Sequence, residues 1–134
     1  MAKEKLNLSG AWKGIFNYPR SLPANQFDAE LRDHQGGLTG ETFERGNSLH
    51  DEGRPLHAMI EGHRHGFDVS FVKRYDEFKR SATPVHYSGK VSADGNEISG
   101  TWDIPNHWSG TFLMIRAKPN AARAEQKIAE VVRS

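Results

Sequence analysis

Residues 98–116 read ISGTWDIPNHWSGTFLMIR, and they contain the same five-residue pattern twice, at 98–102 and 108–112. The pattern is a large apolar residue, Ser, Gly, Thr and a large aromatic residue. Side chains alternate between the two faces of a β-strand, so the first, third and fifth residues of each copy share one face. A turn at 104–107 therefore joins two strands of a hairpin, each with a glycine on the same face as its aromatic residue.

Looser copies of this pattern occur at 8–12, 38–42, 60–64 and 87–91. A glycine on the inward face lets a strand bend and leaves room inside a closed sheet. Alternation and turn residues delimit six strands before the final hairpin, at 8–18, 26–33, 38–45, 56–64, 67–75 and 85–91. Because most links are short, the sequence predicts an all-β fold, an eight-stranded antiparallel up-and-down barrel.

The pattern changes after Pro119, where apolar residues recur near helical spacing: Ala121, Ala124, Ile128, Ala129 and Val132. We therefore expect two parts, a β-barrel domain at 1–118 and a C-terminal α-helix at 119–134. The helix is expected to pack on the barrel or on a neighbouring subunit.

The composition narrows the classes of function. The chain has 134 residues, a net charge of +1 and no cysteine. Bulk charge therefore gives no reason to expect nucleic acid or a membrane as a partner, and disulfides and thiolate metal sites are excluded. The first eight residues are too polar for a signal peptide, and no apolar run reaches the length of a membrane helix. We expect a soluble cytoplasmic protein.

Gly10-x-Trp12 in the first expected strand and Arg116 at the end of the last resemble the signature of the calycin superfamily, which includes lipocalins, fatty-acid-binding proteins and avidins. In that superfamily a basic side chain covers the first-strand tryptophan, so the resemblance implies that Trp12 and Arg116 form a structural plug at a closed end. The alternation of side chains places Arg64 at the same end. Arg64 either takes part in closing that end or is a solvated residue beside the turn at 65–66. The order of segments from 8–12 through 36–40 to Trp102 is similar to avidin and streptavidin.

The biotin-binding residues of avidins do not carry over. By the same alignment Gly14, Thr42, Phe71, Tyr87 and Arg116 replace the family's ligands or wall residues, and only Trp102 keeps its identity. Arg116 stands at the position of a carboxylate that accepts an N–H of biotin, and a guanidinium cannot accept one. The resemblance thus supports the barrel and argues against biotin as the ligand.

Inward positions at the other end combine aromatic rings with a few polar groups. The candidate ligand-binding residues are Tyr18, Thr42, Glu44, Phe71, Lys73, Tyr75, Tyr87 and Trp102. An apolar pocket with a few converging polar groups is the usual small-molecule site, and an eight-stranded barrel can hold one small ligand. Glu44 and Lys73 would orient the ligand's polar ends. The alternative is that these two residues pair in solvent on the rim.

Metal and cofactor sites are not expected. His63 and His86 take the outward parity, and no carboxylate lies at a spacing diagnostic of a metal site, so the histidines are interpreted as surface residues. The sequence also lacks a nucleophile elbow, a phosphate-binding glycine loop and a dinucleotide fingerprint.

The leading hypothesis is therefore a non-catalytic barrel that holds an amphipathic or aromatic small molecule in its mouth. One alternative is an isomerase or lyase in which a Tyr or Lys with a lowered pKa beside Glu44 transfers a proton. Another is a structural or interaction protein in which outward Phe43, Leu113 and Ile115 form an interface. We expect a homodimer or a homotetramer.

Overall fold

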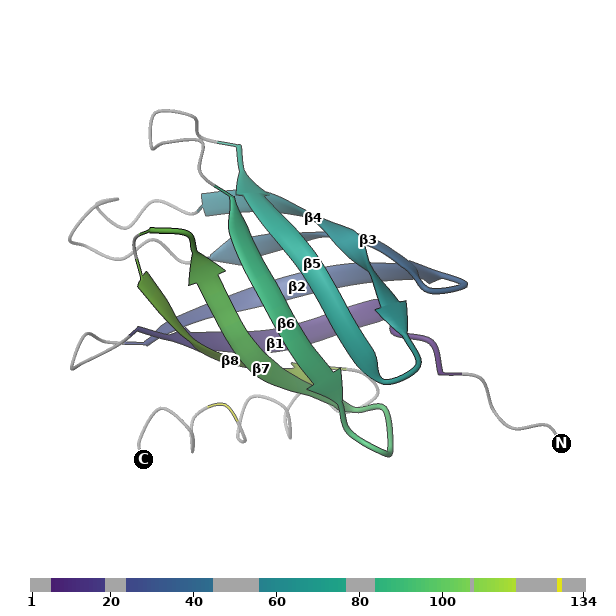
Figure 1. Cartoon of the computed structure of the whole chain (residues 1–134). Coiled ribbons are helices and arrows are strands. Elements are labelled where there is room, and N and C mark those ends of the chain that lie inside the picture. Colours follow the sequence, from purple (N-terminus) through teal and green to yellow (C-terminus); the bar gives the residue numbers. More distant parts are fainter. Residues whose placement is uncertain are drawn as a thin grey trace, which may run out of the picture.

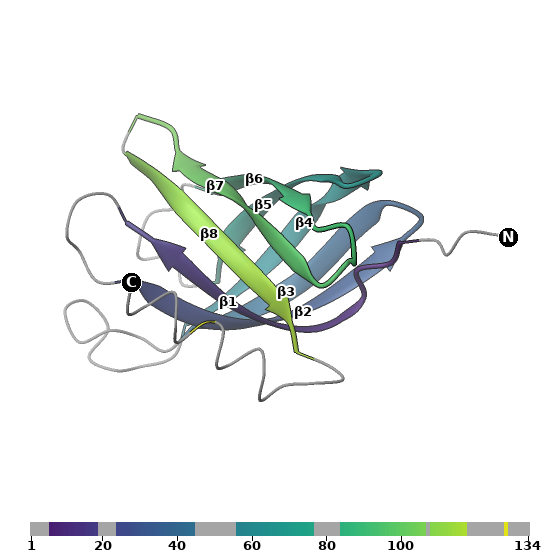
Figure 2. The same ribbon diagram turned by 90° about the horizontal axis from the view of Figure 1, so that it is seen from below.

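The computed structural model describes residues 6–18, 24–44, 56–76, 84–106, 108–117 and 128. The strands are β1 (Gly10–Asn17), β2 (Asn25–His34), β3 (Gly37–Glu44), β4 (Leu56–His65), β5 (Asp68–Tyr75), β6 (Val85–Val91), β7 (Glu97–Ile104) and β8 (Trp108–Arg116). Each strand pairs antiparallel with the next along the chain (Figure 1). The first and last strands also pair, which closes the barrel, and Figure 2 shows β8 beside β1. The predicted all-β, eight-stranded antiparallel barrel is confirmed.

Of the helix predicted at 119–134, only Ile128 is among the described residues. Ile128 is 3% exposed and packs with Ile15 of β1 and Ile115 of β8 in a cluster separate from the main core. Both strand residues have outward parity, so this cluster lies on the outside of the barrel. The rest of the predicted helix, and the boundary at 118, lie outside the described residues.

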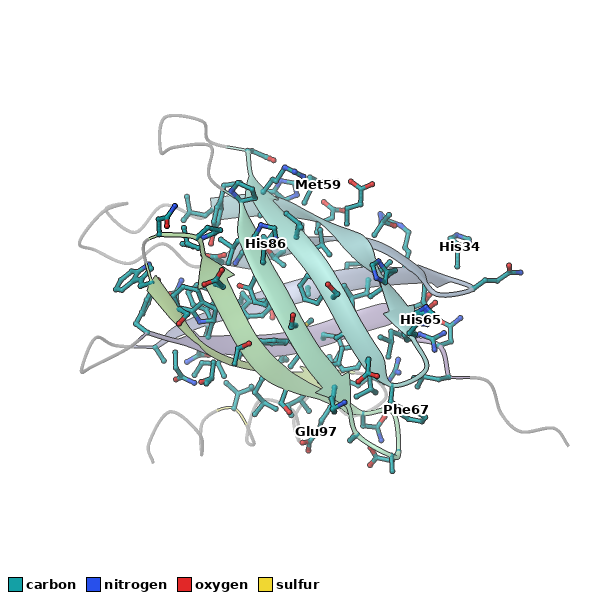
Figure 3. All side chains as sticks on the ribbon, viewed as in Figure 1. His34, Met59, His65, Phe67, His86 and Glu97 are labelled. Carbon is teal, nitrogen blue, oxygen red and sulfur yellow. The ribbon has the colours of Figure 1, made fainter. Side chains whose placement is uncertain are left out.

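The inward face follows the predicted alternation. Trp12 and Phe16 of β1, Trp102 of β7 and Phe112 of β8 all belong to the main buried cluster. Outward positions are more exposed, and Figure 3 shows His34, His65 and Met59 projecting away from the barrel.

The inward glycines make room for neighbouring groups inside the barrel. A Cβ added at Gly14 would lie 2.2 Å from the ring of Phe27. One at Gly110 would lie 2.0 Å from the backbone oxygen of Asn17 and 2.7 Å from the indole nitrogen of Trp102. These aromatic side chains can therefore pack at their observed positions only because the facing residue has no side chain.

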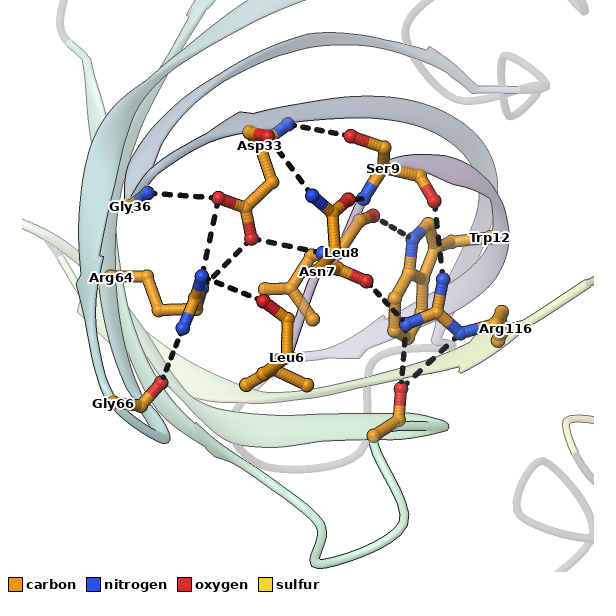
Figure 4. A network of polar contacts seen from close by, with 11 residues as sticks. Leu6, Asn7, Leu8, Ser9, Trp12, Asp33, Gly36, Arg64, Gly66 and Arg116 are labelled. Carbon is orange, nitrogen blue, oxygen red and sulfur yellow. Dashed lines mark hydrogen bonds and ion pairs between the residues drawn. The ribbon is translucent and has the colours of Figure 1, made fainter. Parts of the chain in front are cut away.

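One end of the barrel is closed by two arginines (Figure 4). The Arg116 guanidinium lies 4.6 Å from the centre of the Trp12 ring, in a cation–π arrangement. It also donates to the backbone oxygens of Asn7, Ser9 and Gly95. These contacts tie the residues before β1 and the turn before β7 to the end of β8.

The second arginine of this end, Arg64, is not a solvated residue. Its Nε donates to Asp33 Oδ2 at 2.8 Å, and the Asp33 side chain is fully buried. Asp33 also accepts hydrogen bonds from the backbone N–H groups of Leu8 and Gly36. Arg64 itself further donates to the backbone oxygens of Leu6 and Gly66. With this end closed, the opposite end, where β1, β3, β5 and β7 finish, contains the candidate site; we call it the site end.

Candidate functional site

The predicted site residues lie on the inner face of the barrel toward the site end. Tyr18 directly follows β1, and the others come from β3 (Thr42 and Glu44), β5 (Phe71, Lys73 and Tyr75), β6 (Tyr87) and β7 (Trp102). Tyr18 and Tyr75 are half-buried, and the other six are buried.

Glu44 and Lys73 form a buried ion pair. Lys73 Nζ donates to Glu44 Oε2 at 2.8 Å, and each of the two side chains is only 2% exposed. Tyr75 donates its hydroxyl to the same oxygen at 2.6 Å, and Asn25 Nδ2 donates to Glu44 Oε1 at 3.2 Å. We call these four residues the polar cluster. The alternative of a pair in solvent on the rim is therefore wrong, because the pair lies within the barrel.

Aromatic rings surround the ammonium group of Lys73. Its Nζ lies 4.6–5.6 Å from four ring centres, those of Phe16, Tyr75, Tyr87 and Phe27. Ring faces attract a cation, and the attraction is stronger where water is excluded. The rings and the Glu44 carboxylate together compensate for part of the hydration that the ammonium loses.

This environment shifts the pKa values of the residues that could transfer protons. Burial alone would lower the pKa of Lys73, but the charge of the Glu44 carboxylate and its hydrogen bond to Nζ oppose burial, and the pKa is raised well above its ordinary value. Burial raises the pKa of both tyrosines, although the nearby Lys73 opposes the shift. Lys73 is therefore a cation and both tyrosines are neutral at neutral pH.

The aromatic rings of the site also contact one another, in two groups. Phe71 and Tyr87 stack with their centres 4.9 Å apart, and the edge of Phe112 meets Tyr87 at the same distance. Nearer the site end, Tyr18 lies 5.7 Å from Trp102 and 5.1 Å from Trp108. Trp108 is 39% exposed. The first group and Trp102 belong to the packed interior, whereas Tyr18 and Trp108 present aromatic surface at the site end.

Thr42 differs from the other polar residues of the site. It is 1% exposed, and its Oγ1 is the one buried side-chain polar atom of the described residues without a hydrogen-bond partner. The sequence placed Thr42 among the candidate residues, but only the structure shows the unsatisfied hydroxyl.

One member of the polar cluster, Asn25, and one residue of the closed end, Asp33, are not among the candidate residues predicted from the sequence. Asn25 precedes the strand predicted at 26–33, whereas it is the first residue of β2. Asp33 ends that predicted strand. Both have the inward parity of Phe27, so extending the alternation by one step in each direction would have identified them.

On the outer surface, His57 lies between two carboxylates. Its Nε2 is 2.8 Å from Glu41 Oε1, and its Nδ1 contacts Asp76 Oδ2. The hydrogen bond to Asp76 raises the pKa of His57 above 6.5, and the hydrogen bond to Glu41 adds to this shift.

Within the described ranges no three or more His, Cys, Asp or Glu residues are placed to hold a metal ion. Nor do those ranges contain a helix long and apolar enough to cross a membrane.

The predicted outer patch of Phe43, Leu113 and Ile115 is not one surface. Phe43 on β3 is 47% exposed, whereas Leu113 and Ile115 on β8 pack in the cluster with Ile15 and Ile128. β1 and β2 separate these two strands in the barrel.

No known family model matches the chain, and no curated protein matches it. The eight-stranded antiparallel barrel is compatible with a calycin-like fold.

Proposed function

We propose that this protein binds a small amphipathic or aromatic molecule at the site end of its barrel and does not catalyse a reaction. The observation that supports the proposal most strongly is the buried Glu44–Lys73 pair. Removing two charges from water costs several kcal/mol per ion, and apolar residues of similar volume often fill such a space at least as stably. Filling a small barrel does not require an ion pair, so its presence favours a role in recognition.

Each group of side chains has a place in this proposal. The partly exposed Tyr18 and Trp108 would provide the aromatic wall at the site end, and the buried Trp102 would support it through its ring contacts with both. Glu44 and Lys73 would orient the polar end of the ligand, and Phe71 and Tyr87 would lie beneath it. Pockets of this kind combine mostly apolar walls with a few fixed polar groups.

Binding is favoured over proton transfer by the chemistry of the same residues. An isomerase or lyase would need a Lys or Tyr with a lowered pKa, but the pKa values of Lys73, Tyr75 and Tyr87 are all raised. Tyr75 also donates its single O–H to Glu44 Oε2, and one N–H of Lys73 donates to the same oxygen, so the carboxylate occupies the point where these donors meet.

We also propose that the protein belongs to the calycin superfamily with an avidin-like layout, that it is located in the cytoplasm, and that it forms a homodimer or a homotetramer. Light scattering of the purified protein tests the last of these: a monomer mass at all concentrations would contradict it.

Tryptophan fluorescence tests the binding proposal. A library of aromatic and amphipathic compounds is titrated into the wild type, into Trp102→Phe and Trp108→Phe, and into the control Phe67→Ala. Phe67 is exposed in the turn between β4 and β5, at the closed end. We expect a saturable change that is smaller in at least one tryptophan variant and unaffected in the control. The proposal fails if no compound gives a saturable change, or if the change is equal in all four proteins.

A further inference from the structure

A row of small side chains crosses three neighbouring strands inside the barrel. Thr42 on β3 lies opposite Ala29 on β2 and Ala58 on β4. The next residues in the same register are large, Trp12 on β1 and Tyr75 on β5. The three small residues are all buried, so the inner wall carries only short side chains between these two rings.

The Thr42 hydroxyl lies in the middle of this row without a partner. The alanines on either side offer no hydrogen-bonding side chain. Glu44, two residues further along β3, already accepts hydrogen bonds from Lys73, Tyr75 and Asn25. A buried hydroxyl without a partner destabilises a fold, and valine would have the same shape without that penalty. A threonine at this position therefore points to a partner that does not belong to the described part of the chain.

Tyr75 is the member of the row that is nearest to solvent. It ends β5 and is half-buried, whereas Trp12 at the other end of the row is 1% exposed. Its hydroxyl donates to Glu44 Oε2, and the same oxygen accepts from Lys73. Glu44 would thus keep its counter-charge if the Tyr75 ring turned outward, and such a movement would open a path from the site end to Thr42.

The charges around the row favour an uncharged ligand. Glu44 and Lys73 neutralise each other, and apart from Tyr75 no residue of the row is ionisable. A carboxylate or an ammonium group brought to Thr42 would lose its hydration without gaining a free counter-charge. A hydroxyl or a carbonyl group loses less and can form a hydrogen bond with the threonine hydroxyl.

We propose that Thr42 binds an uncharged hydroxyl or carbonyl group of an aromatic ligand, which reaches it when the Tyr75 ring turns outward. This inference rests on the binding function proposed above and specifies the class of ligand that the site selects.

Three probes with one phenyl ring test the selectivity: benzyl alcohol, benzoate and benzylammonium. Each is titrated at neutral pH into ¹⁵N-labelled protein and followed by amide chemical shifts. The variants are Thr42→Val, Thr42→Ser and the control Thr39→Val, since Thr39 is exposed on the outer face of the same strand. We expect benzyl alcohol to bind more tightly than either ion. Thr42→Val should weaken its binding about threefold to tenfold, whereas Thr42→Ser and Thr39→Val should not.

The outcomes separate this inference from the proposed function. Equal binding of benzyl alcohol to the wild type and Thr42→Val, or tighter binding of benzoate, overturns the inference and leaves the binding function intact. If neither these probes nor the library gives saturable binding, both fail. Thermal unfolding gives a test without any ligand: Thr42→Val should keep or raise the melting temperature. If Thr42→Val lowers the melting temperature and Thr39→Val does not, the Thr42 hydroxyl has a partner within the protein, and the inference is overturned.

Discussion

Removing one partner of the Glu44–Lys73 pair should destabilise the protein far more than removing both. Lys73→Met keeps most of the side-chain length but removes the charge, so the Glu44 carboxylate is left buried with Tyr75 and Asn25 as its remaining donors. Glu44→Leu leaves the Lys73 ammonium among aromatic rings without a counter-charge. In the double variant Lys73→Met/Glu44→Leu, an apolar pair replaces the ionic one.

The burial of the pair sets the size of the effect. Both side chains are 2% exposed, so solvent cannot hydrate the group that remains. Breaking a buried pair in this way typically costs about 3–5 kcal/mol, whereas its replacement by apolar residues is often neutral or stabilising by about 1–4 kcal/mol. The Asp68–Lys90 pair is the matched control, because its side chains are 65% and 77% exposed. Lys90→Met should leave the stability unchanged within error.

Urea unfolding of the wild type and the four variants measures these differences, with circular dichroism and tryptophan fluorescence as two independent probes. We expect each single substitution in the buried pair to lower the free energy of unfolding by about 3–5 kcal/mol, and the double variant to lie within about 1 kcal/mol of the wild type or above it. A loss under about 1 kcal/mol for Lys73→Met would refute the burial argument. If the double variant loses as much free energy of unfolding as the two single variants together, the energetic coupling between Glu44 and Lys73 is refuted.

Three further predictions concern other parts of the barrel. Because the pKa of His57 is raised above 6.5, its contribution to stability is complete below that value and is lost as pH rises through the folded pKa. The difference in unfolding free energy between wild type and His57→Gln should therefore shrink as pH rises above 6.5, and a difference that stays constant would contradict this. Burial would raise the pKa of Asp33, but hydrogen bonds from Arg64 and two backbone N–H groups lower it, so its contribution is present above 3.8 and is lost as pH falls through the folded value. Asp33→Asn should lower the free energy of unfolding by at least about 2 kcal/mol at neutral pH and by less at acidic pH. An equal loss at both pH values would contradict the pairing with Arg64. Gly110→Ala would place a Cβ 2.7 Å from the indole nitrogen of Trp102, so thermal unfolding should show a stability lower by about 1–3 kcal/mol. An unchanged stability would contradict the inward orientation of this glycine.

The barrel could be predicted from the sequence because its main determinant is local. The recurring glycine pattern and the alternation around it fix which residues face inward, and the register in the structure follows that alternation at Trp12, Trp102 and Phe112. Short links between strands then leave few ways to connect them. These features depend only on residues close together in the chain.

The depth and partners of individual side chains could not be predicted in the same way. Parity places Glu44 and Lys73 inside, but whether they meet in solvent or within the barrel depends on the pairing register and on the rings that cover them. Asp33 and Arg64 are 31 residues apart in the sequence, and only the closed barrel brings their side chains together. Such contacts depend on how strands far apart in the chain are offset, which no local pattern encodes.

A crystal structure of the protein soaked with a collection of aromatic fragments would show directly whether the site end binds ligands, because it locates any bound molecule. We expect fragment density at the site end, in contact with Trp102 or Tyr75 and within reach of the polar cluster. Fragments bound only to the outer wall, with the site end filled by the protein's own side chains, would contradict it.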